Sequence, residues 1–215
     1  MLAARPLPET PRFVAGADMS FHPSGRAARG KPQRAWACVV VFRAEPSARG
    51  RWRLTEVERA CAKGRLTFPY VPGLLSFREI PLLLKAFAKL KTKPDLVVCD
   101  AHGTAHPRGF GEACHLGVLL GIPTVGAAKS ILAGSAGDPP PRAGAWTPLE
   151  IDGRAVGAAV RTRDGVRPIY ASPGHLMDLR GAVRAVLACA DGTRLPVPTR
   201  EADRWSKALR REAVG

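Results

Sequence analysis

The sequence predicts one α/β domain in which helices pack on a mixed β-sheet. Extended stretches joined by turns fill the first third of the chain, and helical patterns alternate with short apolar strands after that. The 215 residues, 46% of them hydrophobic, suffice for one sizeable core. Because the chain has no internal repeat and no linker long enough to separate domains, residues 1–215 are expected to form a single domain.

Three extended stretches open the chain, at residues 12–21, 35–44 and 51–62. The second, AWACVVVFRA, is almost continuously apolar, which predicts a strand buried on both faces of the sheet. The loop at 22–34 is long and basic, and either adds contacts to phosphates or is a disordered tip. Its cations are Arg26, Arg29, Lys31 and Arg34.

The pattern changes to helical spacing at Ser76. Apolar residues three or four apart predict a helix over 76–90, and Pro94 follows as a stop signal. Further helices are predicted at 111–121, 176–190 and 199–213. Strands are predicted at 95–100, 122–128, 154–162 and 168–172, and a Pro- and Gly-rich loop at 133–148.

The charge of the chain favours a polyanionic partner. Lys and Arg number 33 against 18 acidic residues, a formal net charge of +15, which suits nucleic acid first and an acidic membrane surface second. An apolar run approaching the ~20 residues of a membrane span is absent from the sequence, and the start MLAARPLPETPRF lacks the apolar core of a signal peptide. We therefore expect a cytoplasmic protein that does not bind membranes.

The five cysteines are odd in number and form no C-x-x-C pair. Several lie in apolar runs, where cysteine behaves as a small hydrophobic residue. This usage predicts a reducing compartment and argues against a disulfide framework or a structural zinc site. The cysteines are Cys38, Cys61, Cys99, Cys114 and Cys189.

Acidic residues mark several boundaries of predicted elements. Asp18 and Asp100 each interrupt or close an apolar strand, where an unpaired charge is costly. If the two strands are neighbours, both carboxylates reach one spot and hold Mg²⁺ or Mn²⁺ through oxygen ligands. A metal there can activate water and stabilise the leaving oxygen of a phosphodiester. The alternative for either acid is a simple turn at the end of its strand.

Glu79 has a competing structural interpretation. Ser76-x-x-Glu79 matches a capping box, which would satisfy free N–H groups at the start of a helix. Pro81 complicates this interpretation, because proline prefers the first turn of a helix, and favours a helix that starts nearer Ile80.

Two further segments carry candidate functional residues. His106 lies in DAHGTAHPR (100–108), where two histidines, an arginine and glycine follow a strand-end acid, as in an active-site loop. Lys129 directly follows an apolar strand and either binds a phosphate or is solvated. His115 lies inside an apolar helix and is interpreted as a core residue.

The stretch TFPYVPGLLSFRE (67–79) sets an aromatic residue between two prolines. Proline fixes φ, so the loop presents its tip stiffly. Such a tip is either a corner of the core or a wedge that enters another molecule. The four residues are Pro69, Tyr70, Val71 and Pro72.

These blocks together resemble the endonuclease V family, which acts on deoxyinosine. The matching blocks are VAGADMSF (14–21), PYVPGLLSFRE (69–79), PDLVVCDAHGTAHPR (94–108), HLGVLLGIPTVGAAKS (115–130), SPGHLMDL (172–179) and RLPVPTREAD (194–203). They span nearly the whole chain in the expected order. The resemblance implies a ribonuclease H-like fold and a Mg²⁺-dependent cut at the second phosphodiester bond 3′ to a deaminated base, usually hypoxanthine.

The resemblance also implies roles for individual residues. Asp18, Glu79 and Asp100 would hold Mg²⁺, with Mn²⁺ as a substitute, while His106 assists and Lys129 steadies the scissile phosphate. Asp95 would be a supporting acid that does not bind the metal itself. Tyr70 and its neighbours would form a wedge in the duplex where the target base is extruded. The base pocket would comprise Leu75, Ala101, Gly103 and Leu132.

One departure from the family pattern bears on the lesion. The family has glycine after the strand-end aspartate, and this chain has Ala101, whose methyl group would tighten the pocket or alter lesion preference. An RNA-directed enzyme that cuts at inosine is the alternative activity, because recognition of a 2′-OH needs only one or two polar groups. A non-catalytic nucleic-acid-binding protein is a third interpretation, against which the retained acids speak. A monomer is expected in each case.

Overall fold

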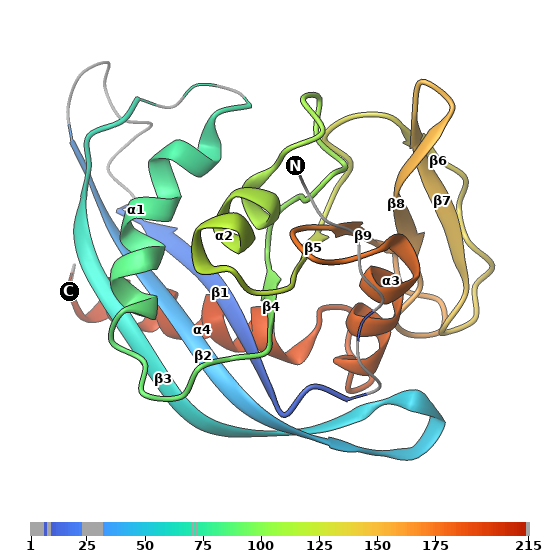
Figure 1. The fold of residues 1–215 in the computed structure, drawn as a ribbon, viewed down its shortest axis with the longest axis horizontal. Coiled ribbons are helices and arrows are strands. Elements are labelled where there is room, and N and C mark those ends of the chain that lie inside the picture. Colours follow the sequence, from blue (N-terminus) through green and yellow to red (C-terminus); the bar gives the residue numbers. More distant parts are fainter. Residues whose placement is uncertain (1–6, 8–9, 23–31, 70, 72, 214–215) are drawn as a thin grey trace.

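The computed structural model describes residues 7, 10–22, 32–69, 71 and 73–213. Its strands form one mixed sheet in the order β3-β2-β1-β4-β5-β9-β8-β7-β6 (Figure 1). The strands are β1 (Phe13–Phe21), β2 (Gln33–Pro46), β3 (Trp52–Leu66), β4 (Leu96–Cys99), β5 (Thr124–Ala128), β6 (Ser135–Ala136), β7 (Trp146–Ile151), β8 (Arg154–Val160) and β9 (Ile169–Pro173).

The centre of the sheet is parallel and its margins are antiparallel. β1 pairs parallel with β4, and β4 with β5, whereas β2 and β3 form a long antiparallel hairpin beside β1. A hairpin followed by two parallel strands is the ribonuclease H-like arrangement, so the predicted fold class is confirmed. Parallel neighbours end at the same edge of a sheet, and the ends of β1 and β4 therefore lie together.

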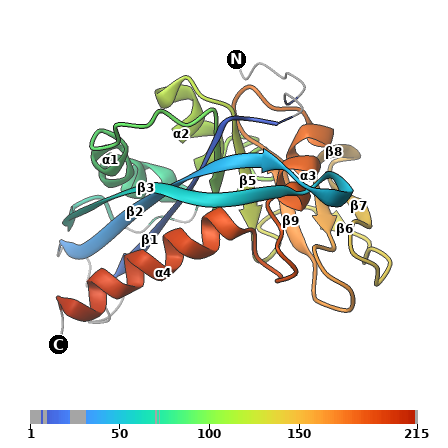
Figure 2. The same cartoon turned by 90° about the horizontal axis from the view of Figure 1, so that it is seen from below.

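In the described part of the chain, four helices cover the two faces of this sheet (Figure 2). They are α1 (Leu75–Phe87), α2 (Glu112–Leu120), α3 (Leu179–Ala188) and α4 (Val197–Glu212), with a short 3₁₀ turn at Ala48–Gly50. Val97 of β4 packs in one core cluster with residues of α1 and α2, and its neighbour Val98 packs in another with residues of α3. This alternation is what a strand buried on both faces requires.

The first turn of α1 differs from its prediction. The helix begins at Leu75 with Leu74 as N-cap, so Ser76 does not cap it and the start nearer Ile80 is wrong. Pro81 lies inside the helix instead. The capping-box interpretation of Glu79 therefore fails, and the Glu79 side chain is buried.

The prediction of a continuous loop over 133–148 is wrong, because strand residues lie near its start and at its end. β6 lies within it, and β7 begins at Trp146 and pairs with β8 in a hairpin whose turn places Asp152 and Gly153 at positive φ. The basic loop falls mainly on residues 23–31, which lie outside the described part of the chain. Among the described residues, no helix is long and apolar enough to cross a membrane.

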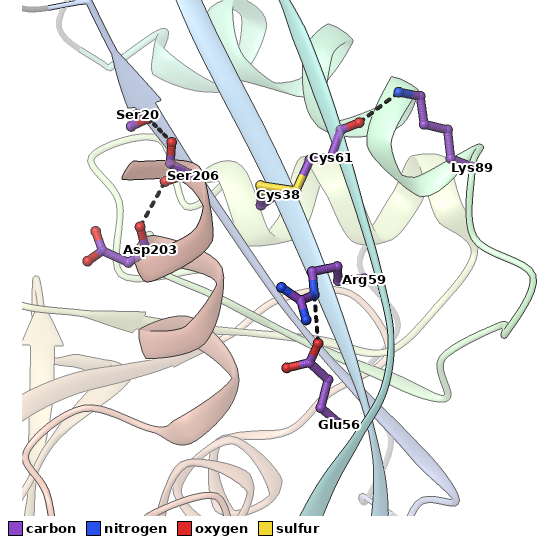
Figure 3. The surroundings of a disulfide bond; sticks show 8 residues. All are labelled: Ser20, Cys38, Glu56, Arg59, Cys61, Lys89, Asp203 and Ser206. Carbon is purple, nitrogen blue, oxygen red and sulfur yellow. Dashed lines mark hydrogen bonds and ion pairs between the residues drawn. A yellow bond between two sulfur atoms is a disulfide. The ribbon is translucent and has the colours of Figure 1, made fainter. Parts of the chain in front are cut away.

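The cysteine argument against disulfides is wrong for one pair. The antiparallel register sets Cys38 of β2 directly opposite Cys61 of β3, and the two form a disulfide with a Cα–Cα distance of 4.2 Å (Figure 3). Cysteine spacing along the chain could not reveal this pairing, because strand register alone creates it. The remaining cysteines are free and buried, as expected: Cys99, Cys114 and Cys189.

Candidate metal centre and nuclease site

Three carboxylates from distant parts of the sequence meet at one end of the parallel strands. Asp18 lies on β1, Asp100 follows the last residue of β4, and Asp203 comes from α4. One oxygen of each lies within 4.8 Å of the other two. Asp18 and Asp100 meet because β1 and β4 are parallel neighbours, and the backbone N–H of Asp100 donates to the carbonyl of Ala17 at 3.4 Å.

Asp203 reaches this site because α4 crosses β1 at very close range. A β-carbon at Gly16 would lie 1.9 Å from the carbonyl oxygen of Pro198, so glycine is required where the first turn of α4 meets the strand. Further along both elements, the hydroxyl of Ser20 donates to the carbonyl of Ser206 at 2.7 Å (Figure 3). These two contacts bracket Asp203 and hold it beside Asp18.

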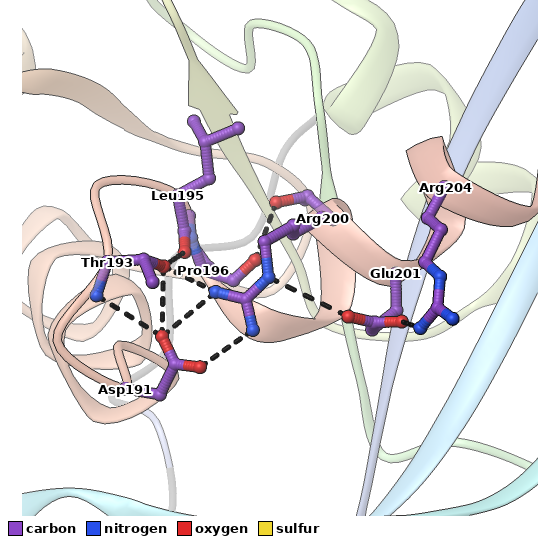
Figure 4. A network of polar contacts seen from close by, with 8 residues as sticks. Asp191, Thr193, Leu195, Pro196, Arg200, Glu201 and Arg204 are labelled. Atoms are coloured by element: carbon purple, nitrogen blue, oxygen red, sulfur yellow. Dashed lines mark hydrogen bonds and ion pairs between the residues drawn. The ribbon is translucent and has the colours of Figure 1, made fainter. Parts of the chain in front are cut away.

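A polar network fixes the start of α4. The guanidinium of Arg200 donates to both carboxylate oxygens of Asp191, at 2.9 and 2.7 Å, and the hydroxyl of Thr193 donates to the same carboxylate at 2.9 Å (Figure 4). Bidentate pairs of this kind are geometrically specific. The network therefore ties the loop after α3 to the helix that carries Asp203.

The electrostatics of the cluster favour a bound cation. Burial, then the nearby charge of Asp100, raises the pKa of Asp18 to about 8. Burial alone would raise the pKa of Asp203, but hydrogen bonds from Lys207 and Asp18 outweigh it and the net shift is downward. Lys129 forms an ion pair with Asp100 and lies 43% exposed at the rim. Clustered carboxylate oxygens that repel one another fit Mg²⁺ or Mn²⁺, which prefer oxygen ligands.

Glu79 lies in the same cavity but not in the three-acid cluster. Burial, then the nearby charge of Glu112, raises the pKa of Glu79 well above its usual value. Glu112 begins α2, and burial raises its pKa to about 7. Within the described residues, the Oε2 atom of Glu112 is closed off from water without a hydrogen-bond partner. Sequence reasoning missed this second acid, because Glu112 looks locally like a first-turn residue of a helix.

The cavity that holds these acids has a volume of about 440 Å³. Its lining combines acids with apolar side chains, among them Leu75, Ala101 and Leu132. The other lining residues are Asp18, Met19, Phe21, Gly73, Ser76, Glu79, Asp100, His102, His106, Gly111, Glu112, Ala128, Lys129 and Ser130. The cavity is thus large enough for part of a nucleotide, and both acidic and apolar side chains line it.

His106 lines this cavity with its ring in a defined orientation. Its Nδ1 accepts the backbone N–H of Arg108 at 3.2 Å, and burial lowers its pKa, so the neutral ring carries its proton on Nε2. That edge of the ring approaches Gly73, where a β-carbon would lie 4.0 Å from Nε2. A neutral imidazole N–H can donate to a phosphate oxygen or to water.

Several of the predicted site residues lie elsewhere or are not described. Asp95 precedes β4 at the end opposite Asp100, and its carboxylate accepts the backbone N–H of Phe13 at 2.9 Å, so its contact is structural. Gly103 is buried against the carbonyl of Pro173 and is not among the residues that line the cavity. Tyr70, the tip of the predicted wedge, lies outside the described residues, as does Pro72. The flanking Pro69 and Val71 are exposed.

Asp203 was not among the predicted metal ligands. Its helix is amphipathic and rich in Arg, and an acid there looks locally like part of a solvated face. The signal was nevertheless present, since Asp203 is the last residue of the block RLPVPTREAD (194–203).

A ribonuclease H-like sheet with clustered carboxylates at the ends of its parallel strands and on a crossing helix defines a metal-dependent nuclease. The family model of endonuclease V matches residues 2–204. Endonuclease V of Roseiflexus sp. (strain RS-1) is 50% identical over 192 residues, which are 89% of this chain and 79% of that protein. The chain therefore belongs to the endonuclease V family, and it is an endonuclease that acts on phosphodiester bonds.

Solved structures of endonuclease V have the same fold as this chain. The crystal structure of endonuclease V from Streptomyces avermitilis matches with a TM-score of 0.86 and 39% identity, covering 100% of this chain and 88% of that one. Ciona intestinalis endonuclease V, in complex with a 24mer DNA containing an inosine followed by a ribo-adenosine, matches with a TM-score of 0.75 and 26% identity. That match covers 94% of this chain and 87% of the Ciona chain.

Proposed function

We propose that this endonuclease recognises a deaminated base, hypoxanthine above all, in DNA and cuts the second phosphodiester bond on its 3′ side during DNA repair. The observation that carries the proposal is a single cavity lined by two acids of the cluster, Asp18 and Asp100, and also by the apolar residues Leu75, Ala101 and Leu132. An extruded base and a scissile phosphate can therefore be bound at the same time. The inosine-containing DNA bound by the Ciona relative supports the choice of lesion.

The acids would hold the metal. Asp18, Asp100 and Asp203 are close enough to share one ion, and Glu79 lines the same cavity as a further ligand. Bound Mg²⁺, or Mn²⁺ as a substitute, would supply Lewis-acid activation of water and neutralise charge at the leaving oxygen. The raised pKa of Asp18 supports a cation at this position, because a nearby positive charge would restore its carboxylate form.

Lys129 and His106 would act on the phosphate. Lys129 is paired with Asp100 at the rim, where its ammonium can turn to a phosphate oxygen once the acids are occupied by a metal. His106 lines the cavity with a neutral ring, whose N–H would donate to the phosphate or hold the attacking water. Both residues would thereby orient the substrate and offset the charge that develops on it.

Leu75, Ala101 and Leu132 would contact the extruded base. They are the predicted pocket residues that line the cavity, and Ala101 adds a methyl group to it. The segment Pro69–Pro72 would act as a wedge that keeps the base extruded, because unstacking costs a few kcal/mol that an aromatic tip partly recovers by stacking. Pro69 and Val71, which flank Tyr70 in the sequence, are exposed.

Inosine-containing RNA is the second candidate substrate. The Ciona relative binds a DNA whose inosine is followed by a ribonucleotide, which favours testing both sugars. We also propose that the enzyme acts as a monomer in the cytoplasm, where its charge of +15 suits an encounter with nucleic acid.

Matched substrates test this proposal. Oligonucleotides of one sequence should be prepared as DNA and as RNA, each with inosine or adenosine at one position, and incubated with Mg²⁺ or EDTA. Cleavage of inosine-containing DNA in Mg²⁺, at a higher rate than the RNA and the adenosine controls, is expected. Faster cleavage of the inosine-containing RNA would show that the enzyme is a ribonuclease that acts at inosine. Equal cleavage of the adenosine controls would show that inosine is not the target.

A further inference from the structure

Four rings form a continuous row on the surface beside the cavity. Phe68 stacks on Phe77 with centroids 6.2 Å apart, and Phe77 contacts the edge of His115 at 5.0 Å. The ring centroid of Phe110 lies 5.9 Å from that of His115. The rings come from the loop after β3, from α1, from α2 and from the loop before α2. We refer to these four residues as the aromatic row.

The row is unusually open to solvent. Phe77 is 52% exposed, Phe110 40% and Phe68 36%. Exposed apolar groups that gather in one place mark binding surfaces, whereas single ones need no explanation. Here three phenylalanines gather within contact of a histidine, so the row is a candidate binding surface.

His115 joins the row as a fixed and uncharged ring. Its Nδ1 lies 3.2 Å from the hydroxyl of Ser76, which sets the plane of the imidazole. Burial lowers its pKa, so the ring is neutral at pH 7. From the sequence we expected His115 to be a core residue. In the structure it is half-buried and contacts aromatic rings. The row therefore presents ring surfaces and no charge of its own.

Two residues of the row are next in sequence to residues that line the nuclease cavity. Leu75 and Ser76 line the cavity, and Phe77 is the next residue of α1. Gly111 and Glu112 also line it, and Phe110 directly precedes them. Arg108, two residues before Phe110, is exposed and donates to the carbonyl of Gly73. The row and the cavity therefore share the start of α1 and the segment before α2, and Ser76, which lines the cavity, also contacts His115 of the row.

We propose that the aromatic row is a stacking platform for the unpaired bases of a nucleic-acid strand that flank the nucleotide in the cavity. Every base has a π-face, so stacking on phenylalanine tolerates any sequence. The net charge of +15 favours an anionic occupant over a second copy of this equally basic chain. This inference rests on the proposed function insofar as the cavity must receive nucleic acid.

Binding of a single-stranded oligothymidylate, which contains no inosine, tests the platform without any cleavage. Fluorescence anisotropy in EDTA should give a dissociation constant for the full-length wild type and for Phe77→Ala, Phe77→Leu, Phe77→Trp and Phe110→Ala. Removing a stacking partner should weaken binding about tenfold in Phe77→Ala. Phe77→Leu, which keeps apolar area without a π-face, should resemble Phe77→Ala, and Phe77→Trp should resemble wild type.

Trp146→Ala is the matched control. Trp146 is also an exposed aromatic residue, at 41%, but it lies on β7 outside the row. Its loss should change binding by less than about twofold. Because Phe77 is half exposed, Phe77→Ala should melt as wild type does, and Phe110→Ala provides an independent second variant on a different segment.

Three outcomes would overturn the platform. If Phe77→Ala and Phe110→Ala both bind as wild type does, and wild type cleaves inosine-containing DNA, the stacking role of the row is refuted and the proposed function stands. A wild type that neither binds the oligonucleotide nor cleaves would refute both. A concentration-dependent dimer in light scattering that Phe77→Ala disrupts, with oligonucleotide binding retained, would assign the surface to a second copy of the chain.

Discussion

The carboxylates of Asp18 and Asp203 lie within 4.8 Å of each other although they come from opposite ends of the chain. One belongs to the first strand and the other to the last helix. Their meeting depends on the close crossing of α4 over Gly16, which a β-carbon would prevent. The metal site is therefore a product of the complete fold, and a chain truncated before α4 would lack it.

Replacing Asp203 tests whether it belongs to the site. Asp203→Asn should lower the cleavage rate roughly 100-fold or more, as loss of one preorganised polar group does in other active sites. Binding of inosine-containing DNA should persist, because Asp203 contributes negative charge that opposes the phosphates. Single-turnover cleavage and filter binding measure the two quantities.

Asp95→Asn is the paired control for that experiment. Asp95 accepts a hydrogen bond from Phe13 at the opposite end of β4, so its loss should cost about 1 kcal/mol of stability and leave cleavage near the wild-type rate. If Asp95→Asn stopped cleavage and Asp203→Asn did not, our assignment of the two acids would be reversed.

Replacing Tyr70 tests whether this residue is a wedge or a corner of the core. A buried aromatic truncation costs roughly 3–5 kcal/mol, so Tyr70→Ala would lower the melting temperature strongly if Tyr70 packed in the core. As a wedge, the same variant should melt like wild type but discriminate less between inosine-containing and normal duplex. The defect should be smaller on single-stranded substrate, and Tyr70→Phe should retain most activity. A large drop in melting temperature with unchanged lesion preference would contradict the wedge.

The sequence predicted those parts of the site that depend on strand patterns. Asp18 and Asp100 interrupt apolar strands, and parallel pairing of these strands brings the acids together as expected. Asp203 and Glu112 were missed, because each looks locally like a surface residue of a helix and becomes part of the site only through tertiary packing. Local rules also misplaced the start of α1, where Pro81 is accommodated inside the helix.

The predicted strands were likewise accurate where local patterns suffice and inaccurate where strand pairing decides. Hydrophobic patterns predicted most strands to within a few residues, but β7 was partly hidden in a Pro- and Gly-rich stretch and forms by pairing with β8. The disulfide between Cys38 and Cys61 depends on register between two strands, which hydrophobic periodicity leaves open.

The pair of Asp191 and Arg200 should give a pH-dependent contribution to stability. Hydrogen bonds from Arg200 lower the pKa of Asp191 from 3.8 to about 2. A lowered folded-state pKa stabilises the protein above the unfolded-state value, and this contribution is lost as pH falls from about 4 to 2. Asp191→Asn should therefore cost about 1 kcal/mol near neutral pH, a modest value because 42% of the side chain is exposed.

Urea denaturation at pH 6 and at pH 3 measures that contribution. The difference in unfolding free energy between wild type and Asp191→Asn should be smaller at pH 3, where part of the stabilisation is already lost. Asp164→Asn supplies a comparison at another exposed carboxylate that accepts a backbone N–H. A difference that grows toward low pH would contradict the assigned pair.

The disulfide predicts the number of reactive thiols. The chain has five cysteines, of which Cys99, Cys114 and Cys189 are free, so thiol titration in denaturant should find three groups without reductant and five after reduction. Reduction should also lower the free energy of unfolding by about 3 kcal/mol, the loop-closure value for two cysteines 23 positions apart. Five reactive thiols in air-oxidised protein would show that Cys38 and Cys61 are not joined.

Mapping the cut in an end-labelled duplex with one inosine tests the proposed activity. A single product is expected in Mg²⁺, ending at the second phosphodiester bond 3′ to the inosine. No product is expected in EDTA, with adenosine in place of inosine, or with Asp18→Asn. Cleavage that persists in EDTA or in Asp18→Asn, or that falls equally on the adenosine duplex, would contradict it.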